Sequence, residues 1–77
     1  MDADKKIVIG KKQTLRALSR DEAKMVYLSK DADLHVTKNI ADVCKEKNIE
    51  IIYFDSMKEL GTSVGISVNA AAAAVLK

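Results

Sequence analysis

The sequence predicts an α/β fold in which a β-sheet lies between helices. Two observations carry this prediction. Apolar runs of strand length alternate with helix-forming segments in the order βαβαβαβ, which is typical of strands joined by helices. Hydrophobic residues make up 48% of the 77 residues, which suffices for one domain over residues 1–77 and excludes a disordered chain. Because there are only two Tyr, one Phe and no Trp, the core must be aliphatic.

The first predicted unit is a strand, a turn and a helix. Residues 7–9, Ile-Val-Ile, form an apolar run closed by Gly10, which indicates a strand leading into a turn. Good helix formers dominate residues 11–18. After a polar break at residues 19–21, the uninterrupted apolar residues 25–28 predict a buried strand.

The second helix is indicated by an apolar stripe with the i, i+4, i+7, i+8 spacing of one helix face. Its members are Val36, Ile40, Val43 and Cys44. Either Asp33 or Thr37 can cap its start, because each side-chain oxygen can accept from unpaired backbone N–H groups. Asn48 can end the helix in a left-handed conformation. Residues 49–54, IEIIYF, then predict another buried strand.

The last third of the chain predicts a short helix, a loop and one ambiguous segment. Ser56 and Glu59 form an S-x-x-E capping box, in which each side chain would accept from a backbone N–H at the helix start. This helix is expected to reach about Val64, and residues 64–69 to form a loop. Residues 70–76 leave two assignments open, because alanine favours a helix whereas the alternation of elements favours a closing strand.

The chain offers no catalytic or metal-binding constellation. His35 is the only imidazole, and it has no partners that would make a nucleophile or a four-ligand zinc site. Cys44 lies on the apolar stripe, so a core position is expected. Asp31 and Asp33 lack a third ligand and indicate turn and cap residues. We therefore expect no enzyme activity, no cofactor and no metal.

The cysteine count and the distribution of apolar residues also bear on where the protein is located in the cell. A single cysteine excludes an internal disulfide framework, which fits a reducing compartment. The N-terminus does not resemble a signal peptide, and no apolar run approaches the ~20 residues of a membrane span. We expect a cytoplasmic protein without membrane contact.

The basic residues are concentrated near the N-terminus. Residues 5–20 hold six basic residues and no acid, whereas the rest of the chain holds seven basic residues and all eleven acidic ones. This asymmetry favours an anion-binding surface in the first quarter of the chain. A charged face that only contacts solvent gives the same pattern and is the alternative.

The strand–turn–helix unit lies within this basic segment. Gly10 frees the turn, and Lys11 and Lys12 fall at the helix start, where unpaired N–H groups and the positive pole of the helix dipole favour phosphate. Lys12, Gln13 and Arg16 share one helix face. Their cations suit phosphates, and the Gln13 amide can donate and accept at a base edge.

An apolar loop is the second candidate for ligand contact. Ile66 and Val68 alternate with Ser67 beside a glycine. These apolar side chains either dock on the core or take up an unstacked base, which irregular RNA displays more readily than duplex DNA. The scarcity of aromatic residues argues against a platform of stacked bases.

Three segments, GKKQTLRAL, SMKELG and VGISVNAAAAAVL, follow one another along residues 5–76. Together they resemble the kink-turn RNA-binding ribosomal proteins of the L-seven-Ae and L-thirty-e superfamily, most of all its short bacterial members. The resemblance implies a three-layer α/β/α sandwich with a central mixed β-sheet, in which residues 70–76 form a strand. It also implies recognition of sharply bent RNA with tandem sheared G·A pairs beside a bulge.

The same resemblance implies which residues meet RNA. Lys12, Gln13 and Arg16 match a helix motif that reads N-E-x-x-K in archaeal members and faces the widened groove at the G·A pairs. Lys58 matches a basic position near the RNA backbone, and the apolar loop matches one that packs on an extruded bulge nucleotide. The implied RNA-binding residues are Gly10, Lys11, Lys12, Gln13, Arg16, Lys58, Ile66, Ser67 and Val68.

The expected partner is therefore a structured RNA that contains a kink-turn, in ribosomal RNA or in an mRNA leader. Neither DNA nor a membrane is an expected partner, and the expected oligomeric state is a monomer. The alternative function is a small protein-interaction or regulatory domain on the same fold without RNA binding, because a fold alone does not determine function.

Overall fold

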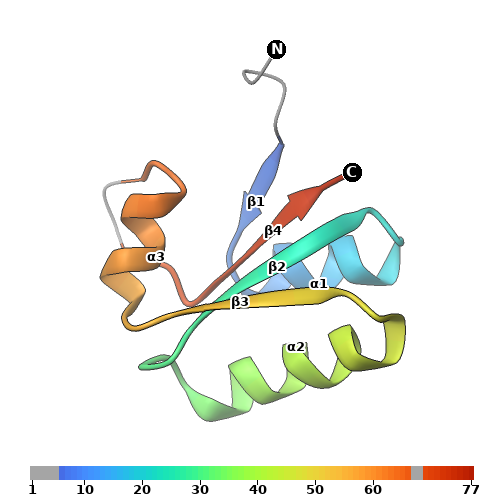
Figure 1. The fold of residues 1–77 in the computed structure, drawn as a ribbon, viewed down its shortest axis with the longest axis horizontal. Helices are drawn as coiled ribbons and strands as arrows, with labels where there is room; N and C mark the ends of the chain where they lie inside the picture. The colour runs from blue at the N-terminus through green and yellow to red at the C-terminus, as the bar shows by residue number, and fades with distance from the viewer. Residues whose placement is uncertain (1–5, 67–68) are drawn as a thin grey trace.

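The computed structural model describes residues 6–66 and 69–77 of the chain. This part of the chain folds into strands and helices in the order that the sequence predicts (Figure 1). The elements are β1 Ile7–Ile9, α1 Lys11–Ser19, β2 Ala23–Ser29, α2 Leu34–Lys47, β3 Glu50–Phe54, α3 Met57–Ser63 and β4 Ala72–Leu76.

The strands form one mixed sheet in the order β1-β4-β2-β3. β4 pairs antiparallel with both β1 and β2, whereas β2 and β3 pair parallel. The last strand in the sequence therefore lies between the first two. The side chains of Ala72, Ala73 and Ala74 in this strand are fully buried.

Helices cover both faces of the sheet. Successive side chains of a strand point to opposite faces, so neighbouring residues of β4 belong to different parts of the core. Ala74 lies between Val8 and Val26 on the face where α1 and α2 pack. Ala73 faces the other way and packs with Leu60 of α3. The fold is thus the predicted α/β/α sandwich with a mixed sheet.

The alanine-rich segment is a strand, as the family resemblance implies. Alanine's helix propensity is overridden here by tertiary context, because the segment is paired on both sides and covered on both faces. Small side chains at Ala73 and Ala74 allow helices to approach the sheet closely from either face.

The other elements lie close to their predicted positions. α1 is one residue longer than predicted, and β2 extends the predicted strand at both ends. Of the two cap candidates for α2, Asp33 is the cap, because its carboxylate accepts from the His35 N–H at 2.8 Å. Asn48 ends α2 in the left-handed conformation, with φ 58° and ψ 42°, and Cys44 is fully buried, both as predicted.

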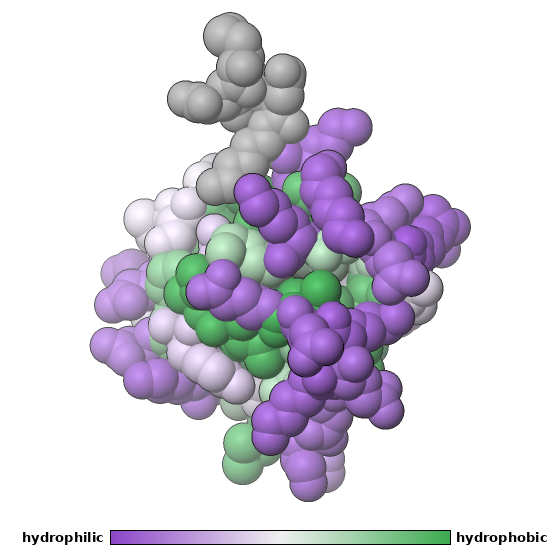
Figure 2. All heavy atoms as spheres, turned by 45° about the vertical axis from the view of Figure 1, so that its right-hand side comes forward, coloured by the Kyte–Doolittle hydropathy of each residue, from purple (hydrophilic) through white to green (hydrophobic). Residues whose placement is uncertain are grey.

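The strand predicted at residues 49–54 is present as β3, but the prediction that it is buried is wrong. β3 lies at the edge of the sheet, and Ile52 and Tyr53 are 37% and 51% exposed. An apolar run indicates a strand but does not report how many of its sides are covered. Ile52 pairs with Tyr27 on the face covered by the seven-residue α3, whereas Tyr53 pairs with Leu28 on the other face. Figure 2 shows that apolar side chains are open to solvent between hydrophilic ones on one side of the molecule.

The crowding around β4 predicts that Ala74 tolerates no larger side chain. Ala74→Val would raise the β-propensity but insert a branched side chain between Val8 and Val26. We expect a loss of about 1–3 kcal/mol in the free energy of unfolding, measured by urea denaturation. Ala71→Val, at a partly exposed position before the strand, is the matched control and should change it by about 0.5 kcal/mol or less. Equal losses in both variants would contradict the crowding.

Candidate functional site

The candidate site lies at one end of the sheet. β1, β2 and β3 all run toward this end, and α1, α2 and α3 follow them, so all three described helices begin there (Figure 1). β4 runs the opposite way and starts at the same end. The positive poles of three helix dipoles therefore gather here and favour a negatively charged ligand. Open α/β sheets generally bind ligands beyond the carboxyl ends of their strands.

Backbone hydrogen bonds hold the start of β4 between two helix starts. The N–H of Gly10, directly before α1, donates to the Ala72 carbonyl at 2.8 Å. The N–H of Ala70 donates to the carbonyl of Met57, the first residue of α3, at 3.0 Å. Residues 70–72 therefore fix the start of α1 relative to the start of α3, although these helices pack on opposite faces of the sheet.

The first two turns of α1 present a basic surface to solvent. We call this surface the α1 basic face, and its exposed members are Lys11, Lys12, Gln13 and Arg16. The buried positions of the same helix are Thr14, Ala17 and Leu18. The α1 basic face is thus opposite the face that packs on the core, as the helical spacing predicts.

The three helix starts differ in their caps. In α2 the Asp33 carboxylate accepts from the His35 N–H, and in α3 the Ser56 hydroxyl accepts from the Glu59 N–H at 3.1 Å. Within residues 6–66 and 69–77, α1 has no side-chain cap and no acidic residue in its first turn. Its first N–H groups are therefore left for water or for a ligand.

The predicted capping box of α3 is only half formed. Ser56 accepts as predicted, but no bond from the Ser56 N–H to the Glu59 carboxylate occurs among the described residues. Asp31, in the loop before α2, instead accepts from the Met57 N–H at 2.8 Å. The sequence indicated Asp31 as a turn or cap residue, but its partner lies 26 residues away and leaves no local signal. Asp31 thus ties the start of α3 to the β2–α2 loop.

The charges of the α1 basic face are not neutralised by any carboxylate in the described part of the chain. The ion pairs among the described residues are Lys30–Asp55, at 3.5 Å, and Lys47–Asp21, at 3.0 Å, and neither involves the α1 basic face. The hydrogen bond and the charge of Lys47 lower the pKa of Asp21. Lys47 is thereby engaged within the protein, whereas the cations of α1 remain available to an anion.

Two further predicted contact residues lie on the α3 side of the sheet. Lys58 is exposed in the first turn of α3. Ile66 is half-buried: its N–H donates to the Gly61 carbonyl at 3.0 Å, and its side chain packs against the core beneath α3. Of the two alternatives for the apolar loop, Ile66 therefore follows the first, in which the side chain docks on the core. Ser67 and Val68 lie outside the described residues.

The described residues give little support for metal binding, for catalysis or for a membrane span. Among the residues that the structure describes, no group of three or more His, Cys, Asp or Glu side chains is placed to hold a metal ion. His35 is exposed, and burial raises the pKa of the Cys44 thiol. No described helix is long and apolar enough to cross a bilayer. What the start of α1 offers at this end of the sheet is positive charge and hydrogen-bond donors.

The fold and site together define a small α/β domain whose strand ends carry an uncapped, basic helix start. A family model described as "Ribosomal protein L7Ae/L30e/S12e/Gadd45 family" matches residues 1–77. The chain belongs to this family, which confirms the resemblance carried by its three sequence segments.

Relatives and solved structures agree with this assignment. A protein of Caldanaerobacter subterraneus named as an RNA-binding protein is 52% identical over 69 residues, which cover 90% of this chain and 84% of the relative. RNA-binding protein YbxF of Geobacillus stearothermophilus is 46% identical over 72 residues, covering 94% and 88%. The structure of a 15.5 kD RNA-binding protein of Giardia lamblia matches with a TM-score of 0.85 at 25% identity. That match covers 92% of this chain but only 60% of the Giardia protein.

The turn before α1 requires glycine for conformational reasons. Gly10 has φ 111° and ψ 159°, a region that is essentially restricted to glycine, although a Cβ there would meet no atom within 4 Å. We expect Gly10→Ala to lower the free energy of unfolding by about 1–3 kcal/mol through backbone strain. Gln13→Ala, on the exposed face of the same helix, should change it by about 0.5 kcal/mol or less.

Hydrogen exchange would locate the effect of Gly10→Ala. The amide of residue 10, which donates to Ala72, should exchange faster relative to the core amides of β2. An alanine variant with wild-type stability and wild-type exchange at this amide would mean that the turn needs no glycine.

Proposed function

We propose that this protein binds RNA and recognises kink-turns, sharply bent segments with tandem sheared G·A pairs beside a bulge. The start of α1 carries the proposal, because it combines exposed Lys11 and Lys12 with N–H groups that no described side chain caps. Such a helix start attracts phosphate through its charge and its donors. Family membership and relatives that are named RNA-binding proteins support an RNA ligand.

In the proposed complex, the α1 basic face enters the widened groove at the G·A pairs. Lys11, Lys12 and Arg16 meet phosphates, which position the protein on the RNA. The Gln13 amide bonds a base edge, since it can donate and accept at once. Gly10 allows the chain to turn into this face while its N–H stays bonded to the sheet.

The α3 side supplies the second half of the proposed contact. Lys58 meets the RNA backbone from the other face of the sheet, at the same sheet end as α1. Ile66 packs on the core. Ser67 and Val68, the next residues in the sequence, contact the extruded bulge nucleotide in this proposal. Apolar contact of this kind suits an unstacked base.

In this proposal, the protein stabilises the kink because it binds the bent RNA more tightly than the unbent RNA. A ligand shifts an equilibrium only as far as it favours one state, so a protein that binds the bent form better stabilises the kink. The targets in this proposal are kink-turns of ribosomal RNA, which would make the protein ribosome-associated, or of mRNA leaders. The protein acts as a cytoplasmic monomer without enzymatic activity.

The salt dependence of binding measures the phosphate contacts. If Lys11, Lys12, Arg16 and Lys58 each meet a phosphate, the log of the affinity for a kink-turn RNA should fall with log salt at a slope of about −3. Lys12→Gln should make the slope shallower by about one, whereas Lys24→Gln, an exposed lysine at the opposite end of the sheet, should not. Anisotropy titrations at several KCl concentrations give the slopes. A wild-type slope near zero would contradict the proposed phosphate contacts.

The base contact is tested by pairing a protein change with an RNA change. Gln13→Ala should weaken binding to the kink-turn by roughly 1–3 kcal/mol. Its effect should be smaller on an RNA whose G·A pairs are replaced by Watson–Crick pairs, because the interacting partner is then already missing. Asn39→Ala removes an exposed amide from α2. It is the control and should leave the affinity for both RNAs unchanged. Equal losses from Gln13→Ala on the two RNAs would contradict a contact at the G·A pairs.

A further inference from the structure

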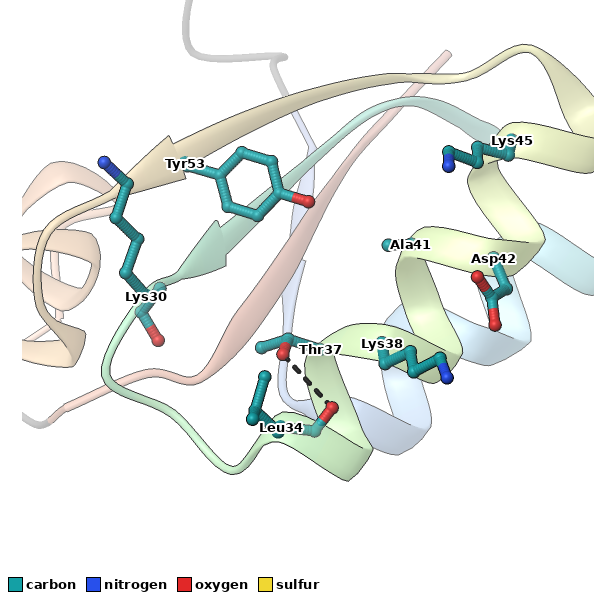
Figure 3. Close-up of a pocket in the computed structure, with 9 residues that line it drawn as sticks. Lys30, Leu34, Thr37, Lys38, Ala41, Asp42, Lys45 and Tyr53 are labelled. Atoms are coloured by element: carbon teal, nitrogen blue, oxygen red, sulfur yellow. Dashed lines mark hydrogen bonds between the residues drawn. The ribbon is translucent and has the colours of Figure 1, made fainter.

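A second surface with features suited to nucleic acid lies between α2 and the edge strand β3. The structure has an open groove of about 500 Å³ there (Figure 3). Its lining includes Leu34, Thr37, Lys38, Ala41, Lys45 and Tyr53. None of these residues belongs to the α1 basic face or to the α3 side of the site described above.

Tyr53 is the chemically distinctive residue of this groove. It is 51% exposed, whereas the chain's other tyrosine, Tyr27, packs edge-on against Phe54 with ring centroids 5.5 Å apart. In Figure 3 the ring of Tyr53 extends from β3 over the groove, with its hydroxyl directed toward α2. Leu34, which also lines the groove, is 77% exposed. An aromatic ring and an apolar side chain thus stand open to a flat partner such as a nucleobase.

The rim of the groove is basic. Lys38 and Lys45 are exposed on α2 and lie two turns, or about 10 Å of helix axis, apart. Lys30 lines the groove as well, but it pairs with Asp55 at 3.5 Å. The lining contains a single acid, Asp42. The groove therefore fits a ligand that carries negative groups on either side of a planar ring.

We propose that this groove binds an unpaired stretch of RNA, with a base stacked on Tyr53 and flanking phosphates held by Lys38 and Lys45. The proposal rests on the proposed function, since the strand would come from RNA bound at the α1 end. Ser29, which lines the groove, donates from its N–H and its hydroxyl to the Ala71 carbonyl, both at 3.2 Å. Ser29 thereby joins the groove lining to the residue that precedes β4, at the sheet end where α1 begins. In this proposal, a strand that leaves the kink-turn reaches the groove along that end of the sheet.

Free hexauridine tests the groove by itself. Tyr27→Phe leaves Tyr53 as the only tyrosine of a chain without tryptophan, so quenching of tyrosine emission reports stacking at Tyr53. We expect saturable quenching, and an affinity lowered about five- to tenfold by Lys38→Gln with Lys45→Gln. Lys24→Gln, at the opposite end of the sheet, should leave it unchanged. Absence of quenching, or quenching that the lysine changes do not weaken, overturns the proposal and leaves the groove to a protein partner or to solvent.

A tailed kink-turn RNA tests the groove within the complex. A hexauridine tail should tighten binding about five- to tenfold over the untailed RNA, a gain typical of one stacked base. Tyr53→Leu should remove this gain and leave the affinity for the untailed RNA unchanged. Equal affinities of the wild-type protein for both RNAs overturn the groove proposal. If neither kink-turn binds but hexauridine still quenches Tyr53, the proposed kink-turn function fails and the groove stands.

Discussion

The geometry of this protein depends on the pairing of one alanine-rich strand. β4 lies between β1 and β2, so the N-terminal strand joins the sheet only through the C-terminal one. Ala73 and Ala74 are fully buried on opposite faces, and their small side chains set how closely the helices approach. At the start of the same strand, the Ala72 carbonyl accepts a hydrogen bond from the Gly10 N–H. Just before the strand, the Ala70 N–H donates to the carbonyl of Met57 in α3. The two halves of the candidate site are therefore held in place by the strand that completes the core.

Because all three described helices begin at one end of the sheet, the distribution of caps decides where an anion can bind. Asp33 places a carboxylate at the start of α2, and Asp31 places one at the start of α3. These carboxylates occupy backbone donors and would repel a second negative group. Lys11 and Lys12 stand at the corresponding place in α1, which concentrates the attraction for anions at one helix start out of three.

How far the sequence predicted the structure depends on whether a feature leaves a local signal. The strand at residues 7–9, the cap at Ser56 and the end of α2 at Asn48 each leave one in neighbouring residues, and each was predicted. The exposure of Tyr53 was not, because an apolar run does not report the order of strands in a sheet. The bond from Met57 to Asp31 was also missed, since it joins residues 26 apart. The RNA contacts of the α1 basic face remain a prediction, because helical spacing establishes a shared face and not its ligand.

The start of α1 breaks several rules of helix stability at once. Lys11 and Lys12 stand at the positive pole of the helix dipole, Lys12 and Arg16 are like charges four residues apart, and no described side chain caps the first N–H groups. Each of these features costs stability in the free protein, and a bound phosphate would offset each of them. Several such local conflicts at one place are typical of a functional site. Because an anion bound there favours the folded chain over the unfolded one, its binding free energy adds to the stability of the domain. The features that weaken α1 by itself are thus the ones that make it complementary to a polyanion.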